Sequence, residues 1–155
     1  MLKNIFKKKE KNTENKNILI AALLIHAAKI DENYTELEKK IIKRAVIDLF
    51  KTNENETNKI IINAEIKEKE SNQIIEFTRE VKKYSMEFRL KIIEIIWKIV
   101  YSDGANYNYE SNLIRRICGL LYISDKDNGI IKMKVKKFYH KIWLILLMKI
   151  VSSVN

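Results

Sequence analysis

Apolar residues recur along this chain at spacings of three and four, which is the period of a helix with one buried face. No stretch keeps the strict alternation of apolar and polar residues that a half-buried strand shows. The pattern therefore predicts an all-α fold, a compact bundle of about seven helices. The predicted helices cover residues 17–30, 36–50, 55–68, 72–84, 86–102, 108–122 and 125–138.

The composition agrees with an all-helical fold. The sequence contains no proline and three glycines, and these are the two residue types that helix interiors tolerate least. The stretch "TELE" predicts a capping box, in which Thr35 caps the helix that follows and Glu38 reaches back to it. Ser71, Ser85 and Ser124 are predicted caps of later helices.

Two segments of the chain share one pattern: an apolar helix, an acidic turn and a second helix with an apolar-apolar-basic-basic run. Asp103 follows Asp31 by 72 residues, and Glu110 follows Glu38 by the same interval. This shared order and register indicate an internal duplication. Paired helical hairpins of this kind usually pack about a pseudo-twofold axis, so we expect the two acidic turns to approach each other.

The repeated carboxylates are candidate ligands of a divalent cation. Oxygen ligands alone suit Ca²⁺, Mg²⁺ or Mn²⁺ rather than Zn²⁺. The second turn matches half of an EF-hand loop, but it lacks the carboxylates of the first positions and is therefore not an EF-hand. The predicted metal ligands are Asp31, Glu38, Asp103 and Glu110.

Two structural roles compete with metal binding at these carboxylates. Acidic residues in a turn before a helix, and in its first turn, are favoured by capping and by the helix dipole. Glu38 already has such a capping role with Thr35. Salt bridges to Arg44 or Arg116, further along the second helix of each copy, are the other alternative.

These segments resemble the TerB-like family, named after the tellurite-resistance protein TerB. The resemblance covers residues 18–134 and depends on "LLIHAAKIDENYTELEKKIIKRAV", "EFTREV" and "IIWKIVYSDGANYNYESNLIRRICGLLYIS". It implies a compact bundle of about seven helices with acidic residues clustered between two halves. It also implies divalent-metal binding and a role in membrane-linked stress complexes, without catalysis. Glu32 and Tyr122 stand where the family pattern has glycine.

The sequence predicts three parts. Residues 1–16 are expected to form a basic, flexible arm, residues 17–136 the helical domain, and residues 137–155 an apolar C-terminal tail or extra helix. The apolar stretch of residues 16–30 is interpreted as a core helix rather than a cleaved signal, because the duplication makes it equivalent to residues 88–102. Three interpretations of the tail stay open: burial by the bundle or a partner, contact with a membrane interface, or disorder.

Catalytic patterns are absent from the sequence, which contains no P-loop, dinucleotide fingerprint, or Ser-His or Cys-His constellation. Cys118 is the single cysteine, so no disulfide is expected within the chain and a reducing compartment is predicted. Its apolar helical context predicts a small buried hydrophobe. His26, alone on the first helix, is interpreted as a packed or surface residue.

The sequence therefore predicts a non-catalytic, cytoplasmic helical module with a protein partner, able to lie peripherally at the inner membrane through its C-terminal tail. A divalent cation is the expected cofactor. A formal net charge of +10 leaves a nucleic-acid-binding protein as one alternative, although no recognition motif is present. The paired carboxylates leave a metal- or carboxylate-dependent enzyme as another.

Overall fold

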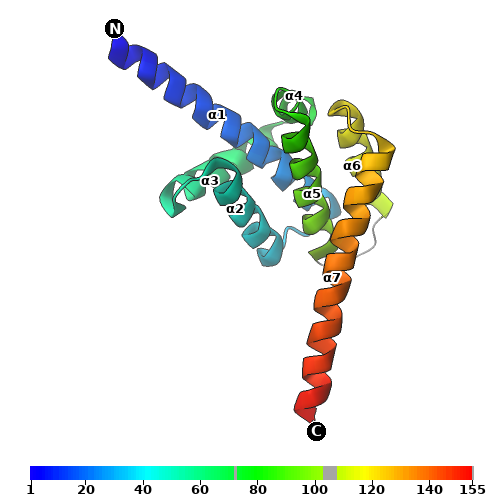
Figure 1. The fold of residues 1–155 in the computed structure, drawn as a ribbon. Helices are drawn as coiled ribbons and strands as arrows, with labels where there is room; N and C mark the ends of the chain where they lie inside the picture. The colour runs from blue at the N-terminus through cyan, green and yellow to red at the C-terminus, as the bar shows by residue number, and fades with distance from the viewer. Residues whose placement is uncertain (72, 103–107, 155) are drawn as a thin grey trace.

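The computed structural model describes residues 1–71, 73–102 and 108–154, and in the last range the side chains from Ser111 onward. In these ranges the chain forms seven α-helices, one short 3-10 helix (η1) and no strand (Figure 1), which confirms the all-α prediction. The elements are α1 (Leu2–Ala28), η1 (Lys29–Asp31), α2 (Glu36–Phe50), α3 (Glu54–Glu70), α4 (Ile75–Val81), α5 (Met86–Ser102), α6 (Asn108–Leu120) and α7 (Asp125–Val154).

The second half of α1 and most of α5 form the centre of the core because they are apolar on most of their faces. Every residue from Ile20 to Ile25 of α1 is completely buried, and α5 contributes a similar run that includes Ile96 and Trp97. Helix α1 packs against α2, α3, α4, α5 and α6, while α5 also contacts α2, α6 and α7. Buried alanines on α1 and Ala64 on α3 leave room for a close approach of these two helices.

The packing agrees with the duplication. Helix α1 contacts α5, and each of these helices also contacts the second helix of the other hairpin, α6 or α2. A twofold relation between two hairpins requires such a reciprocal pattern. Equivalent positions also share their burial, since Leu24 and Ile25 in the first copy and Ile96 and Trp97 in the second are all in the core.

Local capping is responsible for most helix starts. Thr35 Oγ1 accepts from the backbone N–H of Glu38 at 3.2 Å, and Glu38 Oε2 accepts from that of Thr35 at 2.7 Å, so the predicted capping box is confirmed. Ser85 and Ser124 likewise accept from backbone N–H groups three residues later, as predicted. Ser71 was predicted wrongly, because it ends α3 and its hydroxyl donates to the carbonyl of Gln73.

A second capping box was missed at the start of α3. Asn53 Oδ1 accepts from the N–H of Glu56 at 2.9 Å, and Glu56 Oε2 accepts from that of Asn53 at 3.1 Å. The pattern predicted this helix from residue 55 without a cap, although an Asn followed three residues later by Glu is a signal for a helix start. The helix begins at Glu54 for this reason.

Two helices extend well beyond their predicted ends. Helix α1 begins at Leu2 rather than after a flexible arm of residues 1–16, and α7 continues through the predicted tail to Val154. Neither stretch contains proline, and extending an existing helix avoids the cost of nucleation. Burial of the tail by the bundle was a wrong alternative, since residues 140–154 are all exposed. Among the described residues, no helix has the length and apolar character needed to cross a bilayer.

The two departures from the family's glycine pattern lie in left-handed backbone. The φ angle is 62° at Glu32 and 56° at Tyr122. A residue with a Cβ atom pays about 1–2 kcal/mol for this conformation, whereas glycine does not. The left-handed backbone explains why the family pattern has glycine at these two positions. In this chain Glu32 and Tyr122 adopt the same conformation with backbone strain.

We expect Glu32→Gly to raise the free energy of unfolding by about 1 kcal/mol, because it relieves the left-handed strain. Lys40 lies exposed inside α2, where glycine is unfavourable, so Lys40→Gly serves as a matched control and should lower that free energy by about 1 kcal/mol. Urea unfolding followed by circular dichroism measures both changes. A destabilised Glu32→Gly variant would show that the Glu32 side chain has a role that outweighs the strain.

Candidate functional site

The first acidic turn is built by η1 and the residues that follow it. The backbone N–H of Glu32 donates to the carbonyl of Lys29 at 3.0 Å, which closes the turn. Asp31 is exposed, and its Oδ1 accepts from the backbone N–H of Asn33 at 3.0 Å. Asp31 therefore stabilises its own turn in the way that Asp side chains commonly do.

Glu38 differs from Asp31 because its side chain is buried, with 2% of the residue exposed. A buried carboxylate needs compensation for its lost hydration, and the hydrogen bond from the Thr35 N–H supplies part of it. The capping role that competed with metal binding is thus present at Glu38. It does not exclude metal binding, since a carboxylate has two oxygens and several acceptor sites.

The second turn lies mostly outside the described residues. Asp103 is outside them, and so is the side chain of Glu110. The backbone does bring η1, which contains Asp31, into contact with α6, the helix that follows the second turn. The fold thus places the first acidic turn against the second copy of the hairpin, as the duplication predicted.

The described side chains provide only part of a metal site. Asp31 and Glu38 offer hard oxygen donors, which fit Ca²⁺, Mg²⁺ or Mn²⁺, but no group of three or more Asp, Glu, His or Cys in the described ranges is arranged to hold a metal ion. A complete site would need oxygen ligands from Asp103 and Glu110. Metal binding by these four residues stays a prediction.

The structure does not support a salt bridge between Arg44 and the acidic turn. The guanidinium Nε of Arg44 lies 3.4 Å from Asp48 Oδ2, one turn further along the exposed face of α2. Arg116 is also exposed on α6. Arg44 therefore forms its ion pair along its own helix rather than across the acidic turn.

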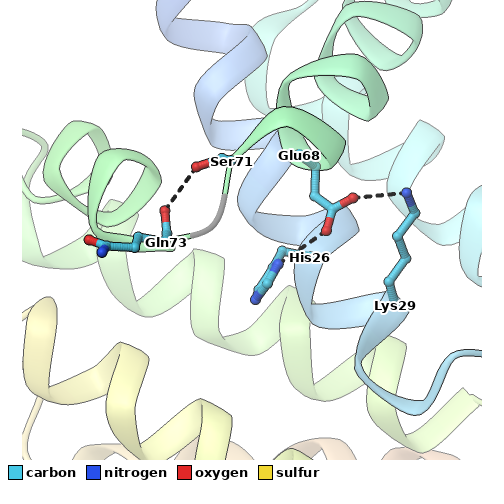
Figure 2. A network of polar contacts seen from close by, with 5 residues as sticks. All are labelled: His26, Lys29, Glu68, Ser71 and Gln73. Carbon is cyan, nitrogen blue, oxygen red and sulfur yellow. Dashed lines mark hydrogen bonds and ion pairs between the residues drawn. The ribbon is translucent and has the colours of Figure 1, made fainter.

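Sequence reasoning missed a polar cluster beside the first turn, shown in Figure 2. Glu68 on α3 places Oε1 3.1 Å from His26 Nδ1 and Oε2 2.8 Å from Lys29 Nζ. The carboxylate thus joins the end of α3 to the end of α1, immediately before the acidic turn. His26 and Glu68 are separated by 42 positions, so no local sequence signal could have paired them.

Tyr34 connects the same turn to α3. Its hydroxyl lies 3.5 Å from Glu65 Oε1, and the ammonium groups of Lys29 and Lys39 lie 5.7 and 5.1 Å from its ring centroid. Burial raises the pKa of Tyr34, and nearby carboxylates, first Glu65 and then Glu38, raise it further. Tyr34 therefore stays protonated and can donate to Glu65 throughout the physiological pH range.

The single thiol of the chain is inaccessible as a nucleophile. Cys118 is buried, and this burial, together with the charge of Asp125, raises the pKa of its thiol to about 12. His26 is engaged by Glu68, and His140 is exposed on α7. The prediction of Cys118 as a buried hydrophobe is confirmed.

Comparison with known proteins agrees with the helical architecture. A family model described as "Tellurite resistance protein TerB" matches residues 17–133, which is most of the chain. Comparisons with curated proteins and with solved structures found no significant match. The chain belongs to the TerB family.

Proposed function

We propose that this chain is a non-catalytic TerB-family module that binds one divalent cation between its two acidic turns and works in a stress-response or membrane-associated complex. The observation that carries the proposal is the contact of η1 with α6, which brings the first turn, with Asp31, to the second copy of the hairpin. Four oxygen donors from the two turns would make a site for a hard cation.

The electrostatics of the first turn also support a cation there. Three carboxylates from two helices act on Tyr34, namely those of Glu36 and Glu38 on α2 and Glu65 on α3. The ammonium groups of Lys29 and Lys39 lie over the ring of Tyr34 and offset part of this negative charge. A cation held by the two turns would lower the remaining repulsion between like charges.

A non-catalytic role is supported by the state of the reactive groups. Proton transfer or nucleophilic attack requires a base within hydrogen-bond reach of its target. Cys118, the single thiol, lies in the core and so meets no substrate. The single, free Cys118 also supports our assignment of the module to a reducing compartment, the cytoplasm.

Isothermal titration of the metal-stripped full chain with Ca²⁺, Mg²⁺ and Mn²⁺ tests the proposed site. We expect saturable heat with about one ion bound, and a stabilisation of about 2.7 kcal/mol when the free ion is a hundredfold above its Kd. The variants Asp31→Asn and Asp103→Asn should lose this heat. Asp48→Asn removes a carboxylate from the exposed face of α2, away from the turns, and should keep it.

Glu38→Gln separates metal binding from capping. Glutamine can still accept from the Thr35 N–H and complete the capping box, so the metal-free variant should keep the start of α2. It lacks the negative charge and the second oxygen of a carboxylate ligand, so ion binding should weaken strongly. Unchanged ion binding in Glu38→Gln would remove Glu38 from the site, and no heat with any of the three ions in the parent would overturn the metal proposal.

A further inference from the structure

The second half of α7 leaves the helical bundle. Its first half packs on α5 and α6, with Val135 buried, and Tyr139 is the last partly buried side chain, its hydroxyl donating to the carbonyl of Lys98 at 3.1 Å. Beyond this point every residue from 140 to 154 is exposed, and the helix projects away from the rest of the molecule (Figure 1). We call residues 142–154 the apolar segment.

The first half of the apolar segment is hydrophobic on every side. Residues 142–148 are Ile, Trp, Leu, Ile, Leu, Leu and Met, and successive residues of a helix point about 100° apart. A partner helix would cover one stripe of such a surface and leave the opposite side in water. A helix that is hydrophobic all round is instead typical of one surrounded by a core or by lipid. A bilayer interior covers every side at once, which favours lipid as the occupant.

The charge next to the segment points to an anionic surface. Three lysines next to the segment are exposed and have no carboxylate partner among the described residues, namely Lys136, Lys137 and Lys141. By contrast, Lys134 Nζ lies 3.3 Å from Glu94 Oε1. Clustered lysines beside an apolar helix attract acidic headgroups. The family match ends at residue 133, so these lysines and the apolar segment are features of this chain beyond the shared pattern.

The order of residues along α7 matches the layers of a membrane. The unpaired lysines come first, then Trp143 with 62% of its surface exposed, then the aliphatic residues. Cations suit the headgroup region, tryptophan the interface and aliphatic side chains the hydrocarbon. The segment extends roughly 20 Å, which is less than the ~30 Å of a hydrocarbon core. It is therefore too short to cross the bilayer, and it fits within one leaflet when the helix is tilted.

We propose that the apolar segment of α7 inserts into one leaflet of an anionic bilayer, with Lys136, Lys137 and Lys141 at the lipid phosphates and Trp143 at the interface. Lys149, the single charged residue of the segment, reaches the headgroups by tilting of the helix and extension of its side chain. This inference develops the membrane-associated part of the proposed function and does not require the metal site.

Flotation of the full chain with lipid vesicles tests the inference, because lipid-bound protein floats and aggregated protein sinks. The experiment uses phosphatidylcholine vesicles with and without one quarter phosphatidylglycerol, in EDTA, so that failure of metal binding does not affect it. We expect binding to the anionic vesicles that weakens with salt, and little binding to the neutral ones. Trp143 emission should shift to the blue on binding, while Trp97, buried in the core, contributes a constant background.

Matched variants decide whether the segment is responsible. Leu144→Ser/Leu147→Ser should lose binding, whereas Leu37→Ser/Ile62→Ser, which changes exposed apolar residues elsewhere, should keep it. Lys136→Gln/Lys137→Gln/Lys141→Gln should weaken binding by at least about tenfold, since each lysine near an acidic surface contributes severalfold to affinity. Circular dichroism should show all three variants folded.

Three results would overturn the inference. Equal binding to neutral and anionic vesicles would remove the role of the lysines. Binding unaffected by Leu144→Ser/Leu147→Ser would place the contact elsewhere on the chain. Absence of binding to either kind of vesicle would show that lipid does not cover the segment. If the chain then formed an oligomer that Leu144→Ser/Leu147→Ser abolished, the segment would instead be covered by a second copy of the chain.

Discussion

Replacing Trp97 by alanine is expected to lower the free energy of unfolding by about 3–5 kcal/mol. Trp97 has 1% of its surface exposed, and its ring centroid lies 5.7 Å from that of Tyr101 in a stacked arrangement. Its Nε1–H donates to Asn128 Oδ1 at 2.9 Å, and Lys132 Nζ lies 5.0 Å from its ring. Trp97 therefore joins α5 to the first half of α7, and its removal leaves both a cavity and an unpaired amide.

Urea unfolding followed by circular dichroism measures the loss, because a tryptophan fluorescence signal would itself change with the substitution. The matched control is Trp143→Ala, which removes the other tryptophan from the exposed apolar segment and should change the free energy of unfolding in water by no more than about 0.5 kcal/mol. Equal effects of the two substitutions would contradict the described packing of α7 on α5. Together, Trp97→Ala and Trp143→Ala distinguish the two halves of α7. The first tests the half that packs on α5 and stabilises the bundle, and the second tests the exposed half that we propose contacts lipid.

Cys118 in the folded protein is expected to react with a thiol reagent at pH 8 at least about fiftyfold more slowly than in the unfolded chain. Burial raises the pKa of the thiol from 9.0 to about 12. The thiolate population at pH 8 is then roughly a thousandfold smaller, and the greater nucleophilicity of a more basic thiolate recovers about a factor of twenty. Exclusion of the reagent from the core slows the reaction further.

Absorbance of the thiolate released from a disulfide reagent measures these rates with and without denaturant. Cys118→Ser/Asn112→Cys moves the thiol to an exposed position on the same helix and should react quickly in the folded state. Rapid reaction of native Cys118 would contradict its burial. Folding raises the pKa of the Cys118 thiol, so the buried neutral thiol contributes fully to stability below pH 9. This contribution is lost as the pH rises towards 12, because the unfolded chain then ionises more readily than the folded one.

Local chemistry made several features predictable from the sequence. The capping box of Thr35 and Glu38 involves groups three residues apart, so its formation depends little on the rest of the fold. Apolar spacing identified the core helices, and the duplicated pattern identified equivalent buried pairs such as Ile25 and Trp97. Family membership followed from the same repeated order of residues.

Helix lengths were less predictable because polar residues permit a helix without requiring one. Helix α1 reaches Leu2 and α7 reaches Val154 since neither end meets a stop signal, and a helix already held by the bundle can extend at little cost. The sequence showed that residues 142–148 are apolar, but their exposure was not evident from it. Whether an apolar helix is buried depends on where its neighbours end in space.

The sequence alone determined the all-α class, the positions of the central helices and the capping of the helix after the first acidic turn, because these depend on periodicity and on contacts within a few residues. The tertiary structure decided which polar groups from distant parts of the chain meet. Glu68 contacts His26 and Lys29, and Glu65 accepts a hydrogen bond from Tyr34. Arg44 forms its ion pair with Asp48 on its own helix. The tertiary structure also decided that α7 leaves the bundle with its apolar segment uncovered. Such pairings depend on the relative placement of whole helices, which results from packing of the entire core and not from any local stretch of chain.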